Sequence, residues 1–204
     1  MSSRKEHIAP GIVAYYDVLE DPKGFISDIE GLVEINNLKW IPGVIRGVGD
    51  DHGVADYGNN NIRDVETIGI PPYTRNPDLK LQGGATLDIH NYLESTLLNE
   101  VKDYASEFGI LPYVTGENWQ LLKYGKGQHF DTHIDDNKLN PRTLSISYYL
   151  NDDYEGGEIE FPRFDVKIKP VANQAIVFAA NYVYSHKIYP VTNGTRYTIV
   201  NWFE

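Results

Sequence analysis

Residues 143–168, TLSISYYLNDDYEGGEIEFPRFDVKI, decide the fold class. They hold three short runs rich in β-branched and aromatic residues, and Gly156-Gly157 is a turn signal between the first two. Further runs of this kind flank the stretch, again separated by turn residues, at 118–124, 174–179, 182–188 and 196–203. Seven or eight evenly spaced strands predict a mainly β protein with supporting α-helices. The expected core is a double-stranded β-helix, which is a jelly-roll or cupin-like double sheet.

The N-terminal half predicts helices and loops that support this core. Asp21-Pro22 is an N-cap signal followed by Pro at the first helical position. Residues 85–108 predict a second helix, and residues 42–80, rich in Gly, Asn and Pro, predict long loops with one short strand at most, either a connection or a lid. We expect one domain over residues 1–204, with 1–112 as support and lid and 113–204 as the core. The second helix carries one apolar stripe, made of Leu93, Leu97, Val101, Tyr104 and Phe108.

The composition narrows the class of protein. The chain has 204 residues, a net charge of −11 and a pI near 4.9, which disfavours a protein that binds nucleic-acid backbones. It has no cysteine, which excludes disulfides, zinc-thiolate sites and cysteine nucleophiles. We find no apolar run typical of a signal peptide or a membrane span, so we expect a cytoplasmic protein without a membrane partner.

The stretch QHFDTHIDD, residues 128–136, contains the metal-binding pattern His-x-Asp twice. His129 and Asp131 form one copy, and His133 and Asp135 form the other. Strand periodicity does not separate the two copies, because all four residues would share one face of an extended chain. His186, in a late predicted strand, is a candidate third ligand. Two His and one carboxylate are the facial triad of non-haem Fe(II) oxygenases, and without thiolates iron is favoured over zinc.

Arg196 opens the last predicted strand, RYTIVNWF. A basic residue on a core-facing β position is costly unless a carboxylate meets it. Arg196 either points to solvent, pairs with an acidic side chain of the chain, or binds the carboxylate of a dicarboxylic cosubstrate, for which guanidinium is well suited.

A longer pattern now connects these residues to a family. The stretch Tyr124-Gly-Lys-Gly-Gln-His-Phe-Asp-Thr-His-Ile-Asp135 resembles the Y-x-x-G-x-x-[YF]-x-x-H-x-D signature of prolyl 4-hydroxylase-like 2-oxoglutarate/Fe(II) dioxygenases. The spacing of this signature selects His133 and Asp135, because counting to His129 misplaces the Gly and aromatic positions. Further matches keep the family's order over residues 118–204: RTLSISYYLN (142–151), EGGE (155–158), FP (161–162), His186, Arg196 and Trp202.

The resemblance implies a role for each of these positions. His133, Asp135 and His186 would bind Fe(II), and Arg196 would bind the C5 carboxylate of 2-oxoglutarate. Tyr149 would help to hold that carboxylate, Tyr124 would line the pocket, and both also suit the role of ordinary buried aromatics. Trp202 corresponds to an aromatic near the metal. His129 and Asp131 are expected on the wall of the mouth, in the second shell or against the substrate. O₂ would be the other cosubstrate, with ascorbate as a reductant.

The resemblance also implies an activity, the hydroxylation of an unactivated C–H bond with formation of succinate and CO₂. The nearest resemblance is to peptidyl-proline hydroxylation, and Tyr57 and Tyr73 are candidates to contact a Pro-containing polypeptide. Three alternatives remain. A free amino acid or other small molecule could be the substrate, or the protein could be a non-catalytic jelly-roll binding module. A nucleic-acid demethylase would be expected to carry a second Arg at position 202, where this chain has Trp.

Overall fold

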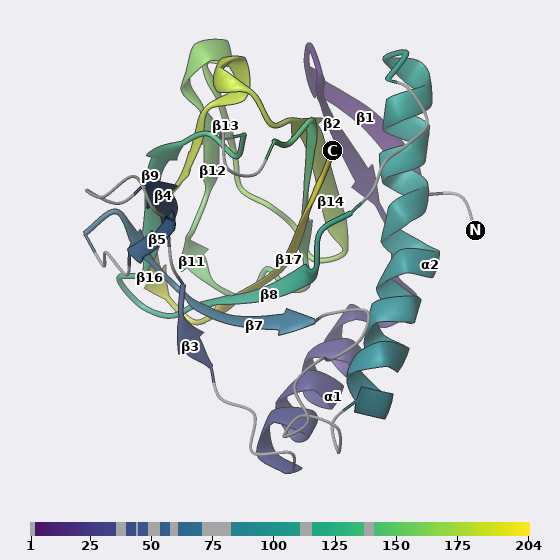
Figure 1. Cartoon of the computed structure of the whole chain (residues 1–204), viewed down its shortest axis with the longest axis vertical. Helices are drawn as coiled ribbons and strands as arrows, with labels where there is room; N and C mark the ends of the chain where they lie inside the picture. Colours follow the sequence, from purple (N-terminus) through teal and green to yellow (C-terminus); the bar gives the residue numbers. More distant parts are fainter. Residues whose placement is uncertain are drawn as a thin grey trace.

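Two facing antiparallel sheets and two α-helices form most of the part of the chain that the structure describes (Figure 1). The computed structural model describes residues 3–35, 40–43, 45–48, 54–57, 61–70, 83–110, 116–136 and 141–204. The larger sheet contains, in spatial order, β1 (Arg4–Ala9), β2 (Ile12–Tyr16), β14 (Gln174–Ala179), β10 (Leu144–Tyr149), β17 (Arg196–Phe203), β8 (Trp119–Tyr124), β7 (Glu66–Ile70) and β3 (Ile41–Pro42).

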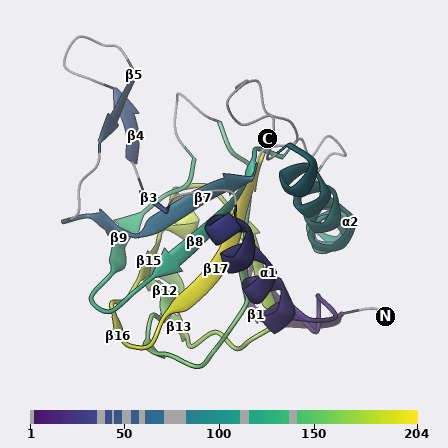
Figure 2. The ribbon, with the colours of Figure 1, turned by 90° about the horizontal axis from the view of Figure 1, so that it is seen from below.

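The smaller sheet lies opposite and has five strands. In spatial order they are β13 (Val166–Ile168), β12 (Ile159–Phe161), β15 (His186–Ile188), β9 (His129–His133) and β6 (Arg63–Asp64). Two short pairs complete the strands: β11 (Glu155–Gly156) with β16 (Val191–Asn193), and β4 (Ile45–Val48) with β5 (Val54–Tyr57). Figure 2 shows the β4–β5 pair projecting from the two-sheet body. This arrangement confirms the predicted mainly β jelly-roll core with supporting helices.

Both helices cover the outer face of the larger sheet (Figure 1). Helix α1 (Pro22–Ile35) begins as predicted, with the Asp21 side chain accepting a hydrogen bond from the Gly24 N–H at 2.8 Å. Helix α2 (Gly83–Glu107) buries the predicted stripe against the sheet, except that Phe108 lies beyond the helix end and is 41% exposed. Gly109 ends the helix with a positive φ.

The space between the two sheets is filled by alternate residues of the strands. On β17 the side chains of Arg196, Val200 and Trp202 point to this interior, whereas Ile199 and Phe203 pack on the helix side. Because β10 and β8 flank β17 on either side, the interior face at this level carries Tyr149 and Tyr124 as well. Four candidate site residues therefore lie on the inner face of the larger sheet: Arg196, Tyr149, Tyr124 and Trp202.

Three segments differ from the sequence-based expectation. The first strands, β1 and β2, were not predicted. The described parts of 42–80, expected to be long loops with one short strand, contain β4 to β7. Strand β6 pairs with β9 and β7 pairs with β8, and these tertiary contacts override the Gly- and Asn-rich composition, while β4 and β5 pair with each other. Residues 182–188, expected to be one strand, form a 3₁₀ turn over Tyr182–Tyr184 and then β15. Among the described residues, neither helix is long and apolar enough to cross a membrane.

Candidate metal centre and cleft

A β-bulge in β9 separates the two His-x-Asp pairs. His133 pairs with His186 on β15, and Phe130 pairs with Ile188. Between these two pairs β9 contains one residue more than β15, which is the mark of a bulge. Residues three apart normally lie on opposite faces of a strand, but the rings of Phe130 and His133 stack on one face with centroids 3.5 Å apart. The bulge therefore turns His133 inward while His129 keeps the opposite face.

His129 and Asp131 lie on that outer face. Their side chains come within 3.9 Å of each other, and the Asp131 side chain is 61% exposed. The backbone N–H of Asp131 donates to the carbonyl of Ile62 at 2.8 Å. Neither residue joins the cluster described next or lines the cleft beside it, so their role at the mouth stays a prediction.

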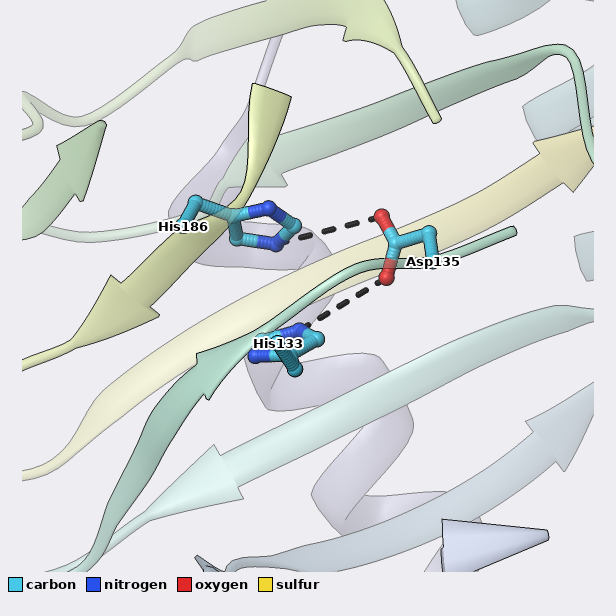
Figure 3. Close-up of side chains that lie close together, drawn as sticks. All are labelled: His133, Asp135 and His186. Carbon is cyan, nitrogen blue, oxygen red and sulfur yellow. Dashed lines mark ion pairs between the residues drawn. The ribbon is translucent and has the colours of Figure 1, made fainter. Parts of the chain in front are cut away.

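His133, Asp135 and His186 converge in the interior (Figure 3). Asp135 Oδ1 lies 3.6 Å from His133 Nε2, and Asp135 Oδ2 lies 3.8 Å from His186 Nε2. One ligand atom from each residue lies within 4.8 Å of the other two. Two imidazoles and one carboxylate at this spacing have the donor set of a facial triad.

Backbone carbonyls orient both imidazoles. His133 Nδ1 lies 2.8 Å from the carbonyl oxygen of Asp131, and His186 Nδ1 lies 3.1 Å from that of Tyr184. Because a carbonyl oxygen only accepts hydrogen bonds, Nδ1 must be the protonated nitrogen in each ring. The lone pair of each Nε2 is left facing Asp135, as metal binding requires.

Aromatic side chains enclose the same rings. His186 packs against Phe161 and Phe178, with centroid distances of 5.6 and 4.8 Å. Burial, helped by the neighbouring His186, lowers the pKa of His133 to about 3. The His133 imidazole is therefore neutral at physiological pH, which is the state in which it can bind a metal.

Asp135 lies beyond the end of β9 and is held by other groups. Its Oδ2 accepts a hydrogen bond from Ser145 Oγ at 2.6 Å, and its backbone carbonyl accepts one from Arg142 Nη1 at 3.1 Å. Burial alone would raise the pKa of the Asp135 carboxyl, but His186, His133 and the Ser145 hydrogen bond outweigh burial and lower it. The carboxylate is therefore ionised as well as buried.

Arg196 places a buried cation on the same interior face. It is 1% exposed, and its Nε and Nη1 have no hydrogen-bond partner among the residues that the structure describes. Its Cζ lies 4.7 Å from the ring centroid of Tyr124 and 5.0 Å from that of Tyr149. Burial would lower the pKa of Arg196, but Tyr149, Tyr154 and Tyr124 raise it, so the guanidinium keeps its charge. An unsatisfied buried cation is costly and suits an anionic ligand.

A cleft that is open to solvent connects these groups. Its walls include the three clustered residues together with Arg196, Tyr124 and Trp202. Tyr149 does not line the cleft: it is fully buried behind the guanidinium, and burial, opposed by Arg196, raises its pKa to about 12. Tyr73 and the side chain of Tyr57 lie outside the described residues.

Arg63 also lines the cleft, and the sequence analysis missed it. It lies on β6, opposite Phe130 of β9, with its Cζ 5.0 Å from the Phe130 ring centroid. Burial lowers the pKa of Arg63. In Ile62-Arg63-Asp64-Val65 two charged residues lie between two apolar ones, so no alternation indicates a strand there, and nothing in the sequence indicates pairing with β9.

Comparison with known proteins shows which protein family this part of the chain resembles. Residues 119–204 match the model of the 2OG-Fe(II) oxygenase superfamily. The match begins at β8 and ends at the last residue, so it contains every clustered residue and Arg196. The name of that superfamily implies Fe(II) as the cofactor, with 2-oxoglutarate and O₂ as cosubstrates, as the sequence predicted; ascorbate stays a prediction.

Individual relatives confirm the resemblance to prolyl 4-hydroxylase-like oxygenases. A protein of Acanthamoeba polyphaga mimivirus whose name assigns it to the prolyl 4-hydroxylases is 28% identical over 114 residues, covering 46% of this chain and 47% of the relative. The matches span less than half the length of the first curated relatives.

Solved structures confirm the fold. A prolyl 4-hydroxylase of Pseudomonas putida superposes with a TM-score of 0.66 at 17% identity, covering 95% of this chain and 92% of that one. A prolyl hydroxylase of Trichoplax adhaerens, in complex with a peptide fragment of the hypoxia inducible factor oxygen degradation domain, superposes with a TM-score of 0.67 at 18% identity. That match covers 95% of this chain and 83% of the other.

Proposed function

We propose that this protein hydroxylates proline residues of a polypeptide, using Fe(II), 2-oxoglutarate and O₂ and forming succinate and CO₂. The observation that carries the proposal is that one cleft holds both His133–Asp135–His186 and the buried guanidinium of Arg196. A site for a metal alone would have no use for that cation. A site for a dicarboxylate alone would have no use for two imidazoles oriented through their Nδ1 atoms.

The residues present fit the metal. His133 offers a neutral imidazole, the Nε2 atoms of His133 and His186 both face Asp135, and Asp135 offers an ionised carboxylate. These three groups would hold Fe(II), and the negative charge of Asp135 would offset one of the two positive charges of the metal. Three coordination positions would remain for other ligands.

The residues present also fit 2-oxoglutarate. Nε and Nη1 of Arg196, which have no partner among the described residues, would donate hydrogen bonds to the C5 carboxylate. Thr198 lies on the same strand and lines the cleft, and its buried Oγ1 also lacks a partner among those residues. Tyr124 would pack on the guanidinium from the cleft side, and Tyr149 would back it. When bound, the metal and the cosubstrate supply the oxidative decarboxylation that puts one oxygen atom of O₂ into the C–H bond.

The chain's own contribution is to position these groups and keep them dry. Phe130 covers one face of His133, while Phe161 and Phe178 enclose His186, so bulk water has little access to the metal from these sides. Trp202 closes the wall beside Asp135, where Arg142 stacks on its ring with Cζ 3.9 Å from the centroid. The open end of the cleft leaves one direction of approach for the acceptor.

Proline in a polypeptide is the acceptor that the relatives support. Several relatives and similar structures carry prolyl hydroxylase names, and one similar structure holds a bound peptide fragment. We further propose that residues 1–204 act as one domain, because β2 pairs with β14 and β7 pairs with β8, which joins the N-terminal segments to the core sheet. Ascorbate as a reductant stays a prediction.

Turnover with defined acceptors tests this function. The protein, loaded with Fe(II) and supplied with 2-oxoglutarate in air, is incubated with Pro-containing peptides, with the same peptides carrying Ala in place of Pro, and with free proline. We expect succinate formation coupled to a gain of one oxygen atom by the Pro peptides alone. Oxidation of free proline but of no peptide would contradict peptidyl specificity. Metal and 2-oxoglutarate binding without any coupled turnover would leave only a binding module.

A further inference from the structure

The carboxylate of Asp135 has two oxygen atoms with different surroundings. Oδ2 accepts a hydrogen bond from Ser145 Oγ at 2.6 Å and lies 3.8 Å from His186 Nε2, while Oδ1 lies 3.6 Å from His133 Nε2. A distance of 2.6 Å is typical of a charge-assisted hydrogen bond between a hydroxyl and a carboxylate. The hydroxyl therefore distinguishes two atoms that are chemically equivalent in a free carboxylate.

Ser145 is also one of the more firmly placed side chains near the cleft. It is 2% exposed and lies on β10, between Phe178 of β14 and Trp202 of β17. A residue paired on both sides in the middle of a sheet has little freedom to move, whereas Asp135 lies outside any strand. The hydrogen bond thus connects Asp135, the member of the cluster that lies outside any strand, to β10, a central strand of the larger sheet.

We propose that Ser145 is a positioning residue of the metal centre: its hydroxyl holds Asp135 Oδ2, so that Oδ1 alone is presented to the metal. This inference rests on the proposed metal centre. If both oxygen atoms of Asp135 bound the metal, they would occupy two of its six coordination positions. The two imidazoles would occupy two more, and only two would stay open. Chelation by 2-oxoglutarate together with O₂ needs three. Ser145 would thus keep open a position that the reaction uses.

Substitutions that remove the hydroxyl of residue 145 while keeping the shape of the side chain constant test this role. Thr and Val have nearly the same shape and both suit a central strand, so Ser145→Thr and Ser145→Val differ in the hydroxyl alone. Ser147→Ala is a matched control, since Ser147 lines the cleft two residues along the same strand. Mn(II) serves as the probe, and the electron paramagnetic resonance signal of free Mn(II) reports binding to metal-free protein. Thermal unfolding of each variant shows that it is folded.

We expect Ser145→Val to weaken Mn(II) binding by about 10- to 100-fold, the usual effect of removing a hydrogen bond to a metal ligand. Ser145→Thr and Ser147→Ala should stay within about threefold of the unsubstituted protein. Equal Mn(II) affinities for the folded Thr and Val variants would overturn the role of Ser145 and leave the metal centre intact. Absence of Mn(II) binding by the unsubstituted protein would overturn the metal centre itself and this inference with it.

Discussion

His133 and His186 are cross-strand partners on β9 and β15, and their ring centroids lie 4.3 Å apart. The two residues are 53 positions apart in the sequence, and direct pairing of adjacent strands brings them together. The backbone carbonyls of Asp131 and Tyr184, each two residues before the histidine that it contacts, orient the two rings. The backbone therefore sets the positions of the two imidazoles before any ligand binds.

Replacement of Arg196 by Met should abolish tight 2-oxoglutarate binding. Removing one partner of a buried charge pair costs about 2–5 kcal/mol, which corresponds to an affinity loss of roughly 30- to 3,000-fold. The same variant should unfold at no lower temperature than the unsubstituted protein when no ligand is present, because Met removes an unsatisfied buried cation.

Calorimetric titration of 2-oxoglutarate into the Mn(II) form measures the first effect, and thermal unfolding measures the second. Arg163→Met provides the control, since Arg163 is an exposed residue on the 3₁₀ turn after β12. Undiminished 2-oxoglutarate affinity in Arg196→Met would mean that the cosubstrate carboxylate binds elsewhere.

The metal-free protein should lose stability in acid partly through His133. Its pKa is about 3 in the folded protein against an ordinary value of 6.5, so between these values the unfolded chain binds a proton that the folded protein does not. Stability therefore falls as pH falls through this window, by at most roughly 1.4 kcal/mol per pH unit from this group. Urea unfolding at several pH values should give a shallower slope for His133→Gln; identical slopes would refute the assignment.

Much of this site could be predicted from the sequence, and the failures have physical causes. The signature spacing selected His133 and Asp135, and the family resemblance selected Arg196 as the residue that binds a carboxylate, although strand alternation left its orientation open. Periodicity alone could not choose between the His-x-Asp pairs, because the bulge that distinguishes them depends on pairing with β15. Arg63 was missed for a similar reason: β6 is two residues long and exists through its contact with β9.

Gly157 should be required for the Arg196 subsite. Its φ is +65°, and an added Cβ would lie 3.0 Å from Tyr154 Cε2 and 3.2 Å from Arg196 Cδ. We expect Gly157→Ala to lower the free energy of unfolding by about 1–3 kcal/mol more than the left-handed backbone alone demands, and to weaken 2-oxoglutarate binding.

Gly109→Ala is the matched control for this substitution. Gly109 has the same φ of +65°, and nothing lies within 4 Å of its added Cβ, so only the backbone cost of about 1–2 kcal/mol applies. Urea unfolding of the two variants isolates the packing contribution. Equal losses of stability would show that the space beside Arg196 is not tightly filled.

Neutralising Arg63 should strengthen metal binding. The guanidinium lines the cleft and interacts electrostatically with Asp135, and it helps to keep the pKa of His133 low. Since like charges repel strongly in a poorly solvated site, Arg63→Gln should bind Mn(II) at least about threefold more tightly. Arg163→Gln removes an equal charge from an exposed site and should have no effect. Weaker Mn(II) binding by Arg63→Gln would assign Arg63 a structural role instead.

The central claim is that His133, and not His129, binds the metal beside 2-oxoglutarate. Anaerobic titration of Fe(II) and 2-oxoglutarate into the purified protein tests it most directly, through the weak visible charge-transfer band of the chelate. The account predicts this band for the unsubstituted protein and for His129→Ala, and its loss in His133→Ala. A band that survives in His133→Ala, or that is missing from the unsubstituted protein, would contradict it.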